Sequence, residues 1–75
     1  MNKPPSISIV IIGYNTCQQL RELLISINNL NIKPNNLEVV YIDDGSSDNS
    51  YNMFSSFEVR YKKTGKRLPK NLGRV

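Results

Sequence analysis

Histidine is absent from this 75-residue chain, and cysteine occurs only once, at position 17. A lone thiol cannot form a disulfide within the chain, so no cross-link compensates for the small core that a chain of this length can bury. A Cys–His catalytic dyad is excluded, and a metal site built on cysteine and histidine is not expected. The sequences Gly-x-Gly-x-x-Gly and Gly-Lys-Ser/Thr are also missing, which excludes a conventional dinucleotide-binding fold and a P-loop.

Long hydrophobic runs are missing as well. The N-terminal segment has one basic residue and then an apolar run of at most six residues. Such a run is too short to span a membrane, and it lacks the small-residue cleavage site of a signal peptide. We expect a chain that is soluble and cytoplasmic, or at least faces the cytoplasm, with any membrane association left to other parts of a longer parent protein.

Acidic residues are missing from the C-terminal end. The chain has ten lysine and arginine residues and six acidic residues, a net charge of +4, and residues 60–75 contain no acid. Two interpretations of this segment stay open: a solvated surface or frayed tail, and a surface that faces phosphates. We call its seven basic residues the basic strip: Arg60, Lys62, Lys63, Lys66, Arg67, Lys70 and Arg74.

Two apolar segments predict parallel strands. Residues 1–6 form a tail, and Ile7–Ile12 is nearly continuous in β-branched residues, which is typical of a central strand in a sheet covered on both faces. Leu37–Ile42 predicts the second strand. With a helix between them, the two strands form a βαβ unit, which implies parallel pairing.

The helix between the strands has the clearest pattern. Apolar residues from Cys17 onward recur at spacings of three and four, which predicts one apolar stripe along a helix of about 14 residues. Thr16 is the expected N-cap, and Gln19 three residues later completes a capping box.

The second half has weaker signals. Ser47 or Asp48 is expected to cap a short helix that runs to about Phe54. Residues 57–61 alternate apolar and charged side chains, which predicts a third, half-exposed strand. No hydrophobic period survives beyond Lys62, so residues 63–75 are interpreted as a basic tail.

These elements predict an α/β fold, a partial Rossmann-like three-stranded parallel sheet with about two helices, in which residues 1–75 are a single partial domain. Cutting such a sheet from a larger one exposes an edge strand and an apolar face. We therefore expect marginal stability, or self-association through the exposed sheet edge.

The most unusual feature of the sequence is the adjacent pair Asp43 and Asp44, at the end of the second strand. Ligands of such folds bind at the carboxyl ends of the strands, where Tyr14 follows the first strand. A tyrosine ring can stack on a nucleobase, and a carboxylate can accept hydrogen bonds from a base N–H or from ribose hydroxyls. Two purely structural alternatives stay open. In one, Tyr14 is a packing residue at the rim of the sheet; in the other, the acidic pair belongs to a polar turn that caps the next helix.

The order of these motifs resembles the N-terminal nucleotide-binding part of the family 2 inverting glycosyltransferases, which have the GT-A-type fold. The resemblance rests on Ser-Ile-Val-Ile-Ile-Gly-Tyr-Asn-Thr at 8–16 and Leu-Glu-Val-Val-Tyr-Ile-Asp-Asp-Gly-Ser-Ser-Asp-Asn-Ser at 37–50, with the leucine-striped helix between them. It implies that Tyr14 packs against the uracil of a UDP-sugar and that Asp44 accepts from the uracil N–H. It further implies that Asp43 holds the strand end or the ribose side, and that the backbone of Ile12 lies along the base.

The same resemblance implies what the chain lacks. The family's Asp-x-Asp, which holds the sugar diphosphate through a divalent cation (Mg or Mn), and its catalytic carboxylate both follow the third strand, and residues 50–75 offer neither. We expect no catalytic residue, metal site or cofactor in this chain, which is interpreted as an inactive N-terminal fragment. Its parent would transfer a sugar from a nucleotide diphosphate to the hydroxyl of an unidentified acceptor with inversion.

A small basic module that binds nucleic acid or phosphate is the alternative function. Against it, the basic strip offers only Tyr61 as a stacking aromatic, and no nucleic-acid-binding motif is present. Nucleic acid is therefore not the expected partner.

Overall fold

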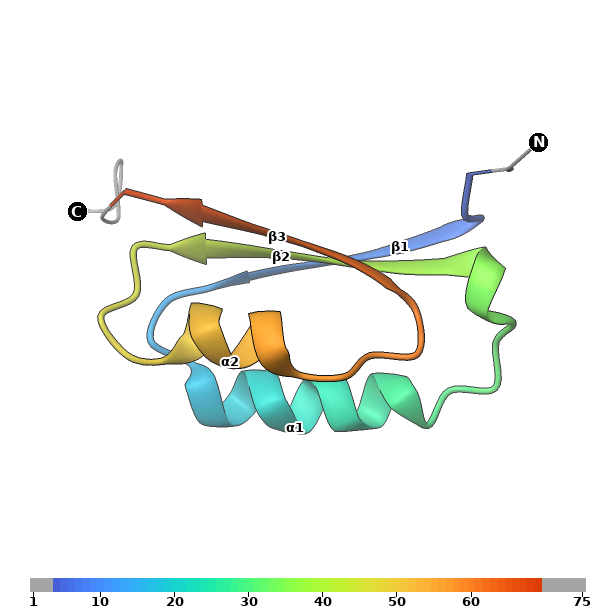
Figure 1. The fold of residues 1–75 in the computed structure, drawn as a ribbon, viewed down its shortest axis with the longest axis horizontal. Coiled ribbons are helices and arrows are strands. Elements are labelled where there is room, and N and C mark those ends of the chain that lie inside the picture. The colour runs from blue at the N-terminus through green and yellow to red at the C-terminus, as the bar shows by residue number, and fades with distance from the viewer. Residues whose placement is uncertain (1–3, 70–75) are drawn as a thin grey trace.

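The computed structural model describes residues 4–69, and within them the fold is a three-stranded parallel sheet with two α-helices (Figure 1). The strands lie in the order β1-β2-β3, and both pairs of neighbours are parallel. The predicted α/β class, the parallel sheet and the number of helices are confirmed. The elements in chain order are β1 (Ile7–Gly13), α1 (Cys17–Asn28), the 3₁₀ turn η1 (Pro34–Asn36), β2 (Leu37–Asp44), α2 (Ser50–Ser56) and β3 (Lys62–Leu68).

Both helices lie on one face of the sheet (Figure 1). Side chains from α1, α2 and β2 meet there in a single core, with Leu24, Tyr41 and Phe54 almost completely buried. The rings of Tyr41 and Phe54 pack at a centroid distance of 5.1 Å. β2, paired on both sides, therefore forms the centre of the fold.

The other face of the sheet is covered by no described helix, which differs from the expectation for the first strand. Among residues 4–69, β1 pairs with β2 alone, and its outward side chains Val10 and Ile12 are 56% and 68% exposed. The continuous apolar run predicted a strand covered on both faces, whereas α1 and α2 pack on one side only. Within the part of the chain that the structure describes, no helix is long and apolar enough to cross a membrane.

Helix α1 follows the predicted stripe and has the predicted N-cap residue, Thr16, but not the predicted capping box. The apolar stripe is buried in the core at Leu20, Leu24 and Ile27. Within residues 4–69, the Thr16 side chain accepts no capping hydrogen bond from the helix. The backbone N–H of Cys17 instead donates to Asp48 Oδ2, at 3.2 Å. The predicted capping box is thus wrong, because a carboxylate from the loop after β2 occupies the helix N-terminus.

The third strand was predicted in the wrong place. Residues 57–61 connect α2 to β3, and Phe57 and Val59 pack partly buried against the core. Tyr61 is buried, and its hydroxyl donates to the carbonyl oxygens of Leu30 and Ile32. The alternation of apolar residues therefore reflects a loop packed on the helices and not a strand.

The observed strand, β3, has few apolar residues and lies within the segment interpreted as a basic tail. Its register with β2 runs from Glu38↔Lys62 to Asp44↔Leu68. Gly65 leaves room for the ring of Phe54, because a Cβ built there would lie 3.2 Å from two ring carbons. The backbone hydrogen bonds to β2 and this close packing stabilise the strand. Its sequence has no periodic pattern of apolar residues from which the strand could be predicted. Residues 70–75 of the predicted tail lie outside the described residues.

Two members of the basic strip are used to complete helix C-termini. Lys63 Nζ donates to the carbonyl oxygens of Phe54, Ser55 and Phe57 at the end of α2. Arg60 donates to the carbonyl oxygen of Leu30, 2.9 Å away and just beyond α1. Helix C-termini carry unsatisfied carbonyl groups and partial negative charge, so a cation at each stabilises the fold.

Lys63→Met is expected to lower the free energy of unfolding by about 1–2 kcal/mol, because three carbonyl groups lose a charged donor. Urea denaturation followed by circular dichroism measures the change. Lys62→Met, at the neighbouring exposed position of β3, is the matched control and is expected to have little effect. Equal losses in the two variants would show that Lys63 acts only through net charge.

Candidate functional site

The candidate site lies where β1 and β2 end. Gly13 and Asp43 are partners in the parallel register, so the loop after β1 and the loop after β2 begin side by side at one edge of the sheet (Figure 1). Tyr14 and Asp44 are the next residue of each chain segment. The structure therefore brings together the two motifs that the sequence singled out.

The four predicted nucleotide-binding residues divide between the two faces of the sheet. Asp43 is in phase with the buried side chains of β2 and is completely buried on the helix-covered face. Alternation places Asp44 on the opposite face, where it is 5% exposed, and the same rule places Ile12 there on β1. Tyr14, in the loop, is 36% exposed.

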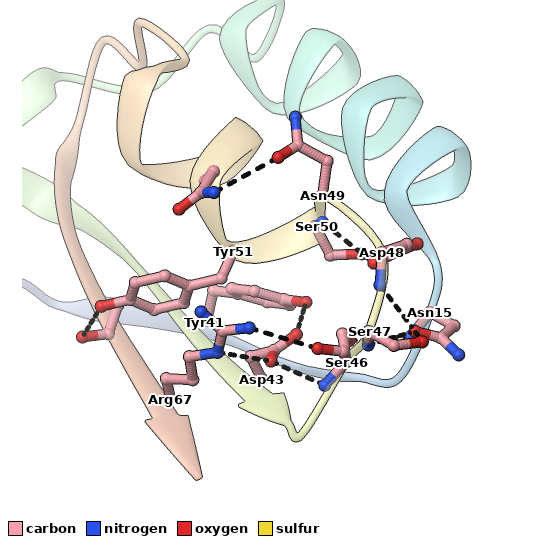
Figure 2. A network of polar contacts seen from close by, with 12 residues as sticks. Asn15, Tyr41, Asp43, Ser46, Ser47, Asp48, Asn49, Ser50, Tyr51 and Arg67 are labelled. Carbon is pink, nitrogen blue, oxygen red and sulfur yellow. Dashed lines mark hydrogen bonds and ion pairs between the residues drawn. The ribbon is translucent and has the colours of Figure 1, made fainter. Parts of the chain in front are cut away.

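Asp43 is the centre of a polar network (Figure 2). Its Oδ1 accepts from the hydroxyl of Tyr41 at 2.8 Å, and its Oδ2 accepts from the backbone N–H of Ser46 at 2.9 Å. Arg67 Nε lies 3.8 Å from Oδ2, and Arg67 also donates to the carbonyl oxygen of Ser46. Asp43 thus closes the turn that follows β2, in which Gly45 takes a φ of 73°.

Burial and this network raise the pKa of the Tyr41 hydroxyl. Burial, together with its hydrogen bond to the Asp43 carboxylate and the charge of that group, raises the pKa of Tyr41 from 10.0 to about 12. The hydroxyl therefore stays protonated and remains a donor to Asp43 throughout the neutral range.

Asn15 joins the two loops, and its role was missed in the sequence (Figure 2). Its backbone has a φ of 52°, in the left-handed region that asparagine tolerates better than most residues. Its Oδ1 accepts from the N–H groups of Ser47 and Asp48, and its own N–H donates to Ser46 Oγ. Asparagine after Gly13 and Tyr14 was a signal for this turn geometry, but nothing local identified partners more than 30 residues away.

Asp48 connects the loop to both helices. Its Oδ1 accepts from the N–H and hydroxyl of Ser50, in the first turn of α2, while its Oδ2 accepts from the N–H of Cys17 in α1. The hydrogen bond from the Ser50 hydroxyl is the main cause that lowers the pKa of Asp48. The predicted cap of α2, Ser47 or Asp48, is wrong, because the N-cap residue is Asn49, although Asp48 still accepts from the N–H of Ser50, the first residue of the helix.

Basic residues and carboxylates at this edge do not assemble a metal site. Among residues 4–69, no group of three or more histidine, cysteine, aspartate or glutamate side chains could hold a metal ion. Arg67 is the member of the basic strip that borders the site, in a pocket formed by Gly45, Ser46, Ser47, Arg67, Leu68 and Pro69. The arrangement offers hydrogen-bond acceptors, an aromatic ring and one cation at the end of a sheet, which suits recognition of a polar planar ligand.

Tyr41→Phe is expected to lower the free energy of unfolding at neutral pH by about 1–2 kcal/mol, because the buried Asp43 loses a donor. The wild-type chain is expected to lose stability as the pH rises from 10.0 through about 12, because only the unfolded state ionises Tyr41 at the start of that range. Urea denaturation at several alkaline pH values measures both effects, and Tyr41→Phe should show the smaller alkaline loss.

Tyr51→Phe is the matched control for this prediction, since the Tyr51 hydroxyl makes only a 3.5 Å contact with the carbonyl oxygen of Gly65. This variant should keep the alkaline loss of the wild type. An unchanged alkaline loss in Tyr41→Phe would contradict the role given to the Tyr41–Asp43 hydrogen bond.

Comparison with known protein families shows what the chain is similar to. The sequence model of glycosyl transferase family 2 matches residues 8–74, which includes the sheet except for Ile7, the first residue of β1, and both loops of the candidate site. No curated protein matches the chain.

Proposed function

The chain belongs to glycosyl transferase family 2, and we propose that it forms the half-site that binds the nucleotide of a sugar donor, a UDP-sugar. The observation that carries the proposal is the register Gly13↔Asp43, which sets Tyr14 and Asp44 at the same edge of the sheet. Ligands of parallel α/β sheets bind outside the carboxyl ends of the strands, which is where these two residues lie.

The proposed contacts are those that the resemblance to the family implies for the four residues, and the chemistry of their side chains suits them. Tyr14 packs its ring on the uracil, and Asp44 accepts a hydrogen bond from the uracil N–H. The backbone of Ile12, one residue before the end of β1, lies along the base. Asp43 is given the indirect role, because its buried oxygens already accept from Tyr41 and Ser46.

We propose that the parent protein transfers the sugar to an acceptor hydroxyl with inversion, assisted by a Mg or Mn ion. The described residues include no cluster suited to such an ion, so the proposal assigns them binding of the nucleotide and no step of the transfer. The ligands of the ion and the catalytic base are assigned to other parts of the parent, for which a cytoplasmic location is also proposed.

Nucleic acid receives less support as the ligand. Three basic side chains that would have to face phosphates are engaged within the fold: Arg60 and Lys63 at helix C-termini, and Arg67 beside Asp43. A surface that binds nucleic acid needs such cations directed at the backbone of the ligand.

Asp44→Asn is expected to weaken UDP binding about tenfold or more, because the base N–H loses a charged acceptor. Titration of the chain with UDP, followed by amide chemical shifts in NMR, measures the affinity, with ADP and GDP as controls for base selectivity. For the wild type, shifts centred on Tyr14 and Asp44 with a preference for UDP are expected.

Glu38→Gln is the matched control variant, because Glu38 lies on the same face of β2 and loses the same charge at the other end of the strand. It should bind UDP as the wild type does. Equal affinity of Asp44→Asn and wild type, or equal shifts with all three nucleotides, would overturn the assignment of uracil to Asp44.

A further inference from the structure

One amide side chain holds the two loops of the candidate site together. Asn15 Oδ1 lies 2.8 Å from the backbone N of Ser47 and 3.2 Å from that of Asp48, and the Ser47 hydroxyl is 3.4 Å away (Figure 2). These partners are 32 and 33 residues along the chain, so the contacts connect segments that are distant in sequence. The bond from the N–H of Cys17 to Asp48 Oδ2 joins the same two segments one step further along.

The backbone of Asn15 contributes a second connection. Its N–H donates to Ser46 Oγ at 2.8 Å, while the left-handed φ of 52° turns the chain between Tyr14 and α1. A residue here must adopt this conformation and also present an acceptor to two N–H groups. Asparagine and aspartate meet both requirements, whereas glycine meets only the first.

We propose that Asn15 is a positioning residue, which fixes the distance between Tyr14 and Asp44 so that both contact one nucleotide. Tyr14 immediately precedes Asn15, and the bonds of Asn15 reach Ser46, Ser47 and Asp48, which follow Asp44 by two to four residues. These bonds therefore tie the segment that carries Tyr14 to the segment that carries Asp44. This inference rests on the function proposed above. It assigns to Asn15 no contact with the ligand.

A similar connection exists at the opposite end of the molecule and provides a control. Asn28, the last residue of α1, donates through Nδ2 to the carbonyl oxygen of Glu58 and accepts through Oδ1 from the N–H of Arg60. It also joins segments about 30 residues apart, but at the amino ends of the strands (Figure 1). Asn28→Gly therefore removes a comparable cross-loop connection far from the candidate site.

The test compares Asn15→Gly, Asn15→Asp and Asn28→Gly with the wild-type chain, by UDP titration in NMR and by amide hydrogen exchange without ligand. Asn15→Gly keeps the backbone conformation and removes only the acceptor, so a loss of UDP affinity of about five- to tenfold is expected. Exchange at the Ser47 and Asp48 amides should become faster. Asn15→Asp should restore the affinity and the protection, because a carboxylate accepts from the same two N–H groups.

Unchanged UDP affinity in Asn15→Gly would overturn the inference. An equal loss in Asn28→Gly would also overturn it, because the effect would then be one of general stability. If the wild type itself binds no UDP, the proposed function fails. In that case unchanged exchange at Ser47 and Asp48 in Asn15→Gly would overturn the positioning role separately, and faster exchange limited to these loops would support it.

Discussion

The buried carboxylate of Asp43 is the constraint on which the candidate site depends. A charged group with no exposed surface must be fully hydrogen-bonded, since an uncompensated buried charge is costly. Its two hydrogen bonds come from the hydroxyl of Tyr41 on β2 and the N–H of Ser46 in the turn, and the guanidinium of Arg67 on β3 adds an ion pair, with Nε 3.8 Å from Oδ2. Satisfying this single group therefore fixes the turn after β2 and ties it to the third strand.

Polar side chains also satisfy backbone groups at both ends of the two helices. The apolar core is small, and polar side chains complete the backbone groups that short helices leave unsatisfied. Asp48 serves the N-terminal ends of α1 and α2 together, while Lys63 and Arg60 serve their C-terminal ends. The contact of Asp48 with Cys17 and that of Arg60 with Leu30 join segments 31 and 30 residues apart, while the contacts of Asp48 with Ser50 and of Lys63 with Phe54 are local.

Patterns of apolar residues predicted the elements whose structure depends on residues close together in the sequence. The β-branched run, the leucine stripe and the second apolar run predicted β1, α1 and β2 correctly because each periodicity arises within one element. The third strand was misplaced because β3 is stabilised by pairing with β2 and by the close packing of Gly65, not by a pattern of apolar residues. In residues 57–61, apolar and charged side chains alternate because this loop packs its apolar residues against the core. The capping box failed, and Asn15 was overlooked, because their actual partners lie more than 30 residues away.

The acidic pair looks repulsive in the sequence, but adjacency along a strand is not adjacency in space. Successive side chains of a strand point to opposite faces, so Asp43 and Asp44 are separated by the sheet itself. Asp43 continues the phase of Leu37, Val39 and Tyr41 and is neutralised from the core side by Arg67. This phase was readable in the sequence and identifies Asp43 as the structural member of the pair. The first carboxylate shapes the strand end, and the second lies on the face that α1 and α2 do not cover.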